Sequence, residues 1–286
     1  MKKLLHTLLP LLLFLAGMCV LFYPTVSDLW NQHRQNSLIS QYIETVSGLT
    51  EADFSAWEEA ARQYNAGLDG SLRDAFSGKD PEPDDPYWSL LNLNGTGVMG
   101  YIQIPKISVR LALYHGTGEQ ALQHGIGHLA GTSLPVGGQG THCVLSGHRG
   151  LPSALLFTDL DQLQNGDRFY LHVLNRTLAY EVDQVLVVEP DNVSALRLEQ
   201  GEDYVTLVTC TPYGINTHRL LVRGRRVPLE AEESEQVSTA QQVIRSFGWR
   251  GRLLAALAAL AVLAGLVFLL YVCGKSRRKK GKKAVR

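Results

Sequence analysis

The stretch that decides the fold is residues 204–224, YVTLVTCTPYGINTHRLLVRG. A run of β-branched and apolar residues leads to Cys210, turn residues follow, and a second run of the same kind starts at His218. If the two runs pair as neighbouring strands, Cys210 and Arg219 lie at the same end of the pair, on either side of one loop. A thiol and a guanidinium would then both reach one bound carbonyl group.

A histidine occurs earlier in a glycine-rich turn, SGHRG at residues 146–150. Cysteine, histidine and arginine side chains that converge on one cleft can carry out acyl transfer, as nucleophile, proton carrier and charge stabiliser. His218 competes with His148 for the proton-carrier role, because it neighbours Arg219. A free cysteine is more often an inert core residue, but a position at a strand end beside a Pro-Tyr-Gly turn lets the sulfur of Cys210 face a cleft.

Several separate blocks resemble one family of enzymes. The blocks MGYIQIPKI, GHRG, TLVTC and TPYGINTHRLLVRG are similar to those of the sortases, specifically the class C sortases that assemble pili. The resemblance covers roughly residues 74–226. It implies a mainly β fold, a closed eight-stranded barrel with N-terminal helices and a lid loop. It also implies His148, Cys210 and Arg219 as catalytic residues, with no cofactor and no metal.

The formal net charge of zero hides a segregation of charge along the chain. All 27 acidic residues lie between Asp28 and Glu235, whereas only 16 of the 27 basic residues lie between Pro24 and Arg250. The middle of the chain is therefore acidic, and the other 11 basic residues lie near the two ends. A nucleic-acid-binding protein would instead gather basic residues on its folded domain, so we expect no nucleic-acid partner.

Two apolar segments predict membrane attachment. Residues 8–22 are apolar and follow two lysines, without a clear cleavage site, which favours an uncleaved anchor over a signal peptide. Residues 253–273 are long enough to cross a bilayer and precede a lysine- and arginine-rich tail. Because positively charged flanks stay in the cytoplasm, we expect the protein to be in the cell membrane with both termini in the cytoplasm and the catalytic domain outside the cell.

Four cysteines are present, and two of them lie in the apolar segments: Cys19 and Cys273. Cys143 and Cys210 could form a disulfide in an extracellular domain. However, Cys143 lies in the middle of a predicted strand, so we expect it to be buried and reduced.

The chain divides into a sequence of expected regions. They are a signal or anchor segment (1–23), a helical region (24–66), a lid loop with its lead-in (67–97), the catalytic barrel (98–228), a connecting segment (229–252), a transmembrane helix (253–273) and a basic cytoplasmic tail (274–286). In the helical region, Thr50 and Asp53 form a predicted capping box before an amphipathic stripe of Phe54, Trp57, Ala61 and Tyr64. Residues 175–177, Asn-Arg-Thr, are the predicted turn of a hairpin.

Two short motifs compete for the role of lid. Class C sortases resemble one another in an Asp-Pro-aromatic motif on a loop that covers the cleft. Asp74-Ala75-Phe76 matches it except for the proline, and Asp85-Pro86-Tyr87 matches it fully. The second motif runs into the first block of the barrel, so we favour Asp74 and Phe76 as the lid residues.

The leading hypothesis is a membrane-anchored cysteine transpeptidase that acts on pilin subunits. It would cleave an LPxTG-like sorting signal, form a thioester, and join the subunit to a lysine amine of another pilin. A sortase that anchors proteins to peptidoglycan and a cysteine hydrolase are the alternative enzymes. A non-catalytic extracellular β-module is the alternative of another class, and it would have an unreactive Cys210.

Overall fold

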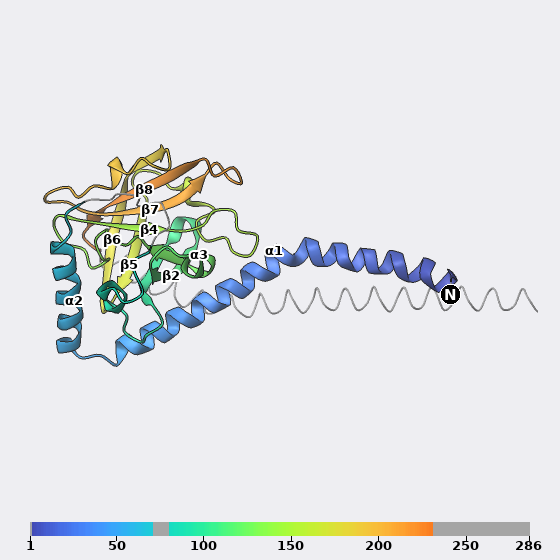
Figure 1. Cartoon of the computed structure of the whole chain (residues 1–286), viewed down its shortest axis with the longest axis horizontal. Helices are drawn as coiled ribbons and strands as arrows, with labels where there is room; N and C mark the ends of the chain where they lie inside the picture. The colour runs from blue at the N-terminus through green and yellow to red at the C-terminus, as the bar shows by residue number, and fades with distance from the viewer. Residues whose placement is uncertain (1, 71–79, 231–286) are drawn as a thin grey trace, which may run out of the picture. The chain divides into compact units, whose positions relative to one another are not determined.

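The structure is a computed structural model that describes residues 2–70 and 80–230; the side chains of residues 2–12 and 15 are not included (Figure 1). The main helices are α1 (Lys2–Ser47), α2 (Glu51–Ala66) and α3 (Glu119–His124). The strands are β1 (Val98–Ile104), β2 (Val109–His115), β3 (Ile126–His128), β4 (Thr141–Ser146), β5 (Arg168–Val173), β6 (Arg176–Val188), β7 (Asp203–Thr211) and β8 (His218–Val227). Short 3-10 turns η1 (Pro86–Ser89), η2 (Pro105–Ile107), η3 (Leu160–Gln162) and η4 (Ser194–Leu196) lie in the connections.

The eight strands close into one barrel in the order β1-β2-β3-β4-β7-β8-β6-β5, which confirms the predicted closed barrel. Neighbouring strands are antiparallel except for two parallel pairs, β2 with β3 and β4 with β7. The parallel pairing of β4 with β7 joins segments about sixty residues apart in the chain. It brings the end of β4 beside the end of β7, where both predicted reactive segments begin.

Alternation along the strands separates an apolar interior from an outer face. On β7 and β8, the side chains of Val205, Leu207, Leu220 and Val222 enter the main core cluster. Their neighbours Val208 and Leu221 belong instead to a second cluster on the outer face, together with Leu129, Val144 and Leu196. Because successive strand residues point to opposite faces, Cys210 lies on the same outer face as Val208.

The C-terminal part of α1 covers the outer side of β1 and β2, so β1 is buried on both faces. Tyr42 fixes this helix, since its hydroxyl donates to the Met99 carbonyl at 2.9 Å and accepts from the Leu174 amide at 2.8 Å. The helix α2 begins with the predicted capping box of Thr50 and Asp53. Its stripe packs on the core as expected, with Phe54 and Ala61 buried and Trp57 and Tyr64 partly buried.

Three details differ from the sequence-based expectation. The hairpin turn between β5 and β6 is Leu174-Asn175, because Val173 already pairs with Arg176 and Leu174 takes the positive φ of 53°. The sequence pattern predicts two separate strands at residues 178–182 and 184–188, but they form the single strand β6, with a register shift at Asp183. The sequence pattern did not single out β2 and β3; β3 has only three residues, too few to show a period.

The favoured lid motif and one of the two predicted membrane segments lie in residues 71–79 and 231–286, which are outside the described structure. Within residues 2–70 and 80–230, no helix combines the length and the apolar character that a bilayer span requires. The second predicted span, residues 253–273, lies outside the described residues. Asp74 and Phe76 also lie outside them.

Candidate active site

Cys210 and Arg219 are directly opposed across the β7–β8 pair. Residues opposite each other in an antiparallel pair project to the same face of the sheet, so the thiol and the guanidinium share the outer face. The connecting loop, residues 212–217, begins with a cis Thr211–Pro212 peptide bond. The Arg219 guanidinium lies near the carbonyls of His218 and Asn216, at 3.3 and 3.4 Å. The predicted placement of both residues at one loop is confirmed.

The pairing of β4 with β7 brings His148 to the same edge. Ser146 pairs with Val208, and the next residue, Gly147, donates its amide to the Val208 carbonyl at 3.0 Å. The Thr209 hydroxyl donates to the Gly147 carbonyl at 2.7 Å. Two consecutive residues of β7, Val208 and Thr209, thus hold the backbone immediately before His148.

His148, Cys210 and Arg219 line one pocket on the outer face of the barrel. Its other lining residues are Thr117, Leu122, Leu129, Val144, Ser146, Gly147, Val208 and Thr209. Four of these residues, Leu122, Leu129, Val144 and Val208, give the pocket an apolar part. The pocket is open, since Cys210 and His148 are both only partly buried.

The alternative histidine does not reach this pocket. His218 pairs with Thr211, one position along β8 from Arg219, so its side chain projects to the opposite face. It is exposed, and its Nδ1 atom contacts the Thr217 hydroxyl at 2.9 Å. The structure thus brings together the histidine of the GHRG turn, and not His218, with the thiol and the guanidinium.

Arg149 ties the loop that follows His148 to the end of β7. Its Nη1 donates to the Thr211 hydroxyl at 3.1 Å, and its Nε donates to the Thr158 carbonyl at 3.1 Å. A third contact is an ion pair between its Nη2 and the Asp161 carboxylate. Because Thr211 directly follows Cys210, one guanidinium connects the segments that carry the histidine and the thiol.

Two glycines allow the close approach of these loops. At Gly147, a β-carbon would lie 2.7 Å from the Phe157 ring, which a real side chain could not tolerate. Gly150 has a φ of +80°, a conformation that favours glycine, and it packs against the Tyr213 ring. Both glycines of the SGHRG turn are therefore required sterically on either side of His148 and Arg149.

Burial lowers the pKa of His148, and the nearby charge of Glu119 opposes that shift. The imidazole is consequently neutral in most molecules at neutral pH. Cys143 has a different environment, because it is fully inside the core and burial raises its pKa well above the ordinary value. Among the described residues, Cys19, Cys143 and Cys210 are all free, so the expected buried and reduced Cys143 is confirmed.

Comparison with known proteins agrees with this geometry. A family model described as a sortase domain matches residues 102–227. The crystal structure of sortase C-1 from Streptococcus pneumoniae is 45% identical, with a TM-score of 0.64, over 68% of this chain and 100% of that one. Sortase C1 from Streptococcus agalactiae is 47% identical, with a TM-score of 0.60 and the same coverage. This chain belongs to the sortase family.

Other relatives with lower sequence identity to this chain are sortases as well. Sortase A of Streptococcus agalactiae is 30% identical over 150 residues, which are 51% of this chain and 58% of the relative. Sortase D of Bacillus subtilis is 30% identical over 131 residues, and the chain spans 63% of its length. Members of the family are cysteine transpeptidases, and the structural neighbours named above are class C sortases.

The aromatic residue of the Asp85-Pro86-Tyr87 motif is part of the core, whereas Asp85 and Pro86 are exposed. Tyr87 is 1% exposed, and its hydroxyl lies 2.9 Å from His128 Nδ1 and accepts the Gly116 amide at 2.9 Å. A tyrosine bonded in this way cannot leave to uncover a cleft without breaking the core. Asp74 and Phe76, which lie outside the described residues, remain the predicted lid residues.

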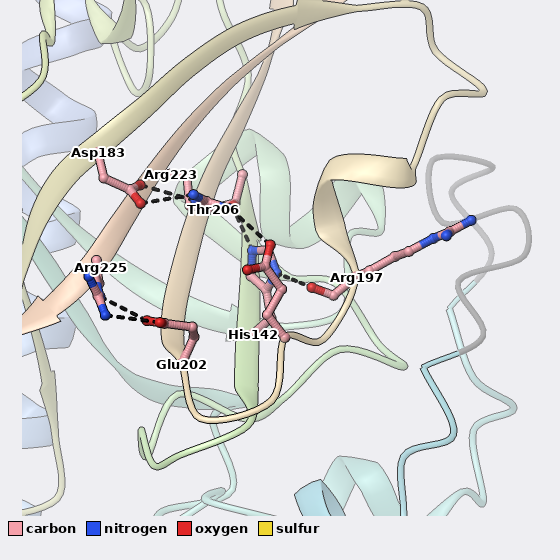
Figure 2. Close-up of polar contacts among 8 residues, drawn as sticks. His142, Asp183, Arg197, Glu202, Thr206, Arg223 and Arg225 are labelled. Carbon is pink, nitrogen blue, oxygen red and sulfur yellow. Dashed lines mark hydrogen bonds and ion pairs between the residues drawn. The ribbon is translucent and has the colours of Figure 1, made fainter.

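The sequence did not reveal a polar network on the same outer face, which Figure 2 shows. It contains the buried residues His142 and Thr206, and Arg223 with its two acidic partners Asp183 and Glu199. Arg223 forms an ion pair with each of these two carboxylates. The signal that could have revealed His142 is its place in β4, two residues before Val144 on the same face. Within residues 2–70 and 80–230, no cluster of three or more histidine, cysteine or acidic residues could hold a metal ion.

Proposed function

We propose that this sortase is a membrane-tethered cysteine transpeptidase that polymerises pilins. The observation that carries the proposal is the convergence of Cys210, His148 and Arg219 on one pocket from three separate segments. In this proposal, Cys210 is the nucleophile, His148 carries the proton, and Arg219 stabilises the developing oxyanion.

The reaction has two acyl transfers. The Cys210 thiolate attacks the threonine carbonyl carbon of an LPxTG-like signal, and the resulting oxyanion lies against the Arg219 guanidinium. The tetrahedral intermediate collapses as the Thr–Gly C–N bond breaks, and protonated His148 gives its proton to the leaving glycine amine. A thioester remains on Cys210. A lysine amine of the next subunit then attacks this thioester, neutral His148 takes a proton from it, and the thiolate leaves as an isopeptide bond forms.

Two opposing effects set the fraction of molecules in which His148 is protonated. Attack requires a thiolate together with a protonated imidazole. Burial lowers the pKa of His148, so the protonated form is the minority at neutral pH. The carboxylate of Glu119 counteracts this effect and favours the imidazolium.

The substrate class follows from the pocket walls and from the neighbours. Leu122, Leu129, Val144 and Val208 present an apolar surface to the residues that precede the scissile bond, which suits the leucine and proline of the signal. The structure of sortase C from Streptococcus pneumoniae is described as providing insights into pilin substrate specificity, and a sortase C of group B Streptococcus is described as pilus-related. We extend both descriptions to this chain as part of the proposal.

The proposal includes a lid that carries Asp74 and Phe76. The described flank of this loop supports it, because the Asp80 carboxylate accepts the Thr117 amide at 2.7 Å and Thr117 lines the pocket. The C-terminal flank of the loop therefore re-enters the described fold beside the site. Asp74→Ala and Phe76→Ala should each speed alkylation of Cys210 and cleavage of a signal peptide, whereas Ser71→Ala should change neither. Unchanged alkylation in both lid variants would remove the lid from the proposal.

The proposal also includes anchoring at both ends, with the barrel outside the cell. It rests on the apolar segments 8–22 and 253–273 and on their basic flanks. Protease treatment of intact cells should remove the barrel from full-length protein and leave the basic tail protected. Protection of the whole chain would contradict this topology.

The central experiment replaces the nucleophile. Cys210→Ala in the full chain should abolish both cleavage of a fluorogenic LPxTG-type peptide and formation of covalent pilin polymers. Cys143→Ala is the matched control, since it removes a thiol from the core and should retain both activities. Covalent polymers made by the Cys210→Ala variant would end the proposal, and peptide cleavage without polymers in the wild type would indicate a different acceptor.

A further inference from the structure

The loop between β6 and β7, residues 189–202, is attached to the outer face of the barrel at two points. One point is the buried ring of His142 on β4, and the other is the Arg223 guanidinium on β8 (Figure 2). Both side chains lie on the face that carries Cys210 and Arg219: Arg223 is four residues after Arg219 on β8, and His142 is on β4, where it pairs with Tyr204 of β7. We call the contacts of His142 with Arg197 and Thr206 the loop latch.

The hydrogen bonds of His142 have one consistent assignment. The Nδ1 atom lies 2.9 Å from the Arg197 carbonyl oxygen, which can only accept, so Nδ1 carries the hydrogen. Burial lowers the pKa of His142, and the ring is neutral. The Nε2 atom therefore accepts from the Thr206 hydroxyl, 2.7 Å away. The ring is only 1% exposed, so the two bonds form away from water and both partners would be costly to leave unpaired.

Figure 2 shows that the Arg197 side chain points away from His142, so the latch holds the backbone of the loop. This contact does not depend on which side chain occupies position 197. The latch joins a strand to a loop position 55 residues later, and Thr206 lies 64 residues after His142. It is therefore a tertiary contact that joins β4, β7 and the loop, and it forms only when the barrel has folded.

The second attachment is built on a β-bulge. The register of β6 with β8 shifts at Asp183, which places an additional residue opposite Arg223. Its carboxylate accepts from Arg223 Nε at 3.1 Å and from Nη2 at 2.9 Å. The remaining Nη1 reaches Glu199 on the loop at 3.3 Å, and the guanidinium stacks 4.0 Å from the centre of the Tyr204 ring. The Tyr204 ring also contacts His142 edge-on, so the two attachments support each other.

The attached loop reaches the pocket through one apolar side chain. Leu196 directly precedes Arg197 and is 1% exposed. It packs in the outer-face cluster with Leu129, Val144 and Val208, and these three residues line the pocket of Cys210. Fixing the Arg197 carbonyl therefore fixes the side chain that supports the apolar wall of the pocket.

We propose that His142 is a positioning residue for substrate binding: it latches the β6–β7 loop so that Leu196 holds the apolar wall against which the upstream part of the sorting signal binds. This inference rests on the proposed function. It predicts that loss of the latch weakens binding of the peptide while the chemistry at Cys210 continues. A residue of purely structural importance would instead lower all activities together.

The test uses the full chain in mild detergent, a fluorogenic LPxTG-type peptide and iodoacetamide as a small thiol reagent. His142→Leu should raise KM by about tenfold, since it leaves a buried carbonyl without its donor. Both kcat and the alkylation rate of Cys210 should stay within about twofold of wild type, because the reacting groups are untouched. His142→Asn retains a donor near the Nδ1 position and should recover most of the KM. Hydrogen exchange of the amides at residues 196–198 should accelerate in the leucine variant.

Arg225→Ala provides the matched control. Arg225 lies on the same face and pairs with Glu202 at the base of the loop, where the Glu202 carbonyl already accepts the amides of Gly140 and Thr141. This variant should leave KM and hydrogen exchange unchanged. An unchanged KM in His142→Leu, or a His142→Asn variant as impaired as His142→Leu, would overturn the latch.

Two further outcomes, a His142→Leu variant that does not fold and a wild type without peptide cleavage, also test the latch. If His142→Leu does not fold, Thr206→Val takes its place; faster exchange at residues 196–198 supports the latch and unchanged exchange overturns it. If the wild type cleaves no LPxTG-type peptide, the proposed function fails. Hydrogen exchange then still decides whether His142 holds the loop, so the two failures remain distinguishable.

Discussion

At the scale of single residues, burial separates the histidines of this sortase into different chemical groups. Burial lowers the pKa of His128 to about 4 and that of His172 to about 3, so both are neutral parts of the core. His142 is also buried and bonded at both ring nitrogens. Among the histidines whose side chains are described, His148 alone lines the pocket with Cys210, which suits a group that must gain and lose a proton.

The geometry of Arg219 predicts that charge alone cannot replace it. Arg219→Lys should lower kcat by about 10²- to 10³-fold, because a lysine cannot present the same planar set of donors to an oxyanion. Peptide cleavage under saturating substrate measures the change. Arg225→Lys is the control, since Arg225 is exposed and forms only a surface ion pair on the same strand. Wild-type kcat in the Arg219→Lys variant would assign the oxyanion role to another group.

At the scale of elements, the site depends on how β4 and β7 lie side by side. Their parallel register places Ser146 beside Val208, and the bonds of Gly147 with β7 continue this alignment up to His148. Beyond that point, Arg149 connects the His148 loop with Thr211 and Asp161. The strands thus determine where His148 enters the site, and one arginine restrains the loop beyond it.

Arg149→Lys should disturb this alignment. A lysine can keep one of the three contacts, so the loop gains freedom and kcat/KM should fall by roughly 10- to 100-fold, the scale expected from a misplacement of about 1 Å. Alkylation of Cys210 should change little, because the thiol itself stays in β7. Arg168→Lys, which alters a partly exposed ion pair with Glu181 on the other side of the barrel, serves as the control. Kinetics equal to wild type would show that the strands alone position His148.

At the scale of the whole molecule, buried neutral histidines make the fold sensitive to acid. In the unfolded chain, His128 and His172 take up protons near pH 6.5, whereas in the folded protein they do so only near pH 4 and pH 3. Between these values the unfolded state binds more protons. The free energy of unfolding is therefore greatest above pH 6.5 and falls as the pH decreases.

We expect the free energy of unfolding to be up to about 4 kcal/mol lower at pH 5 than at pH 7.5, at about 1.4 kcal/mol per pH unit for each histidine. Denaturant titrations followed by tryptophan fluorescence at the two pH values measure this difference. His33→Gln should leave it unchanged, because His33 is exposed on α1. Equal stability at pH 7.5 and pH 5 would show that neither buried histidine controls the acid limit.

Features of this protein that depend on contacts within a few residues could be predicted from the sequence. The β pattern around Cys210, the turn that follows and the nine-residue spacing to Arg219 predicted a hairpin with both residues at one loop, because pairing across a short loop leaves few registers. The capping box at Thr50 and the stripe on α2 depend on contacts within a few residues, so they were also predictable. The closed barrel followed from the resemblance to sortases.

The tertiary structure decided what depends on contacts between distant segments. Only the parallel pairing of β4 with β7 places His148, and not His218, beside the thiol, since alternation turns His218 to the other face. The loop latch could also be found only in the folded structure. His142 contacts partners 55 and 64 residues away, and the periodic pattern of apolar residues in the sequence does not indicate such contacts. Hydrogen bonds and register within a hairpin are local properties of the chain, whereas the meeting of three strands and a loop is a property of the closed barrel.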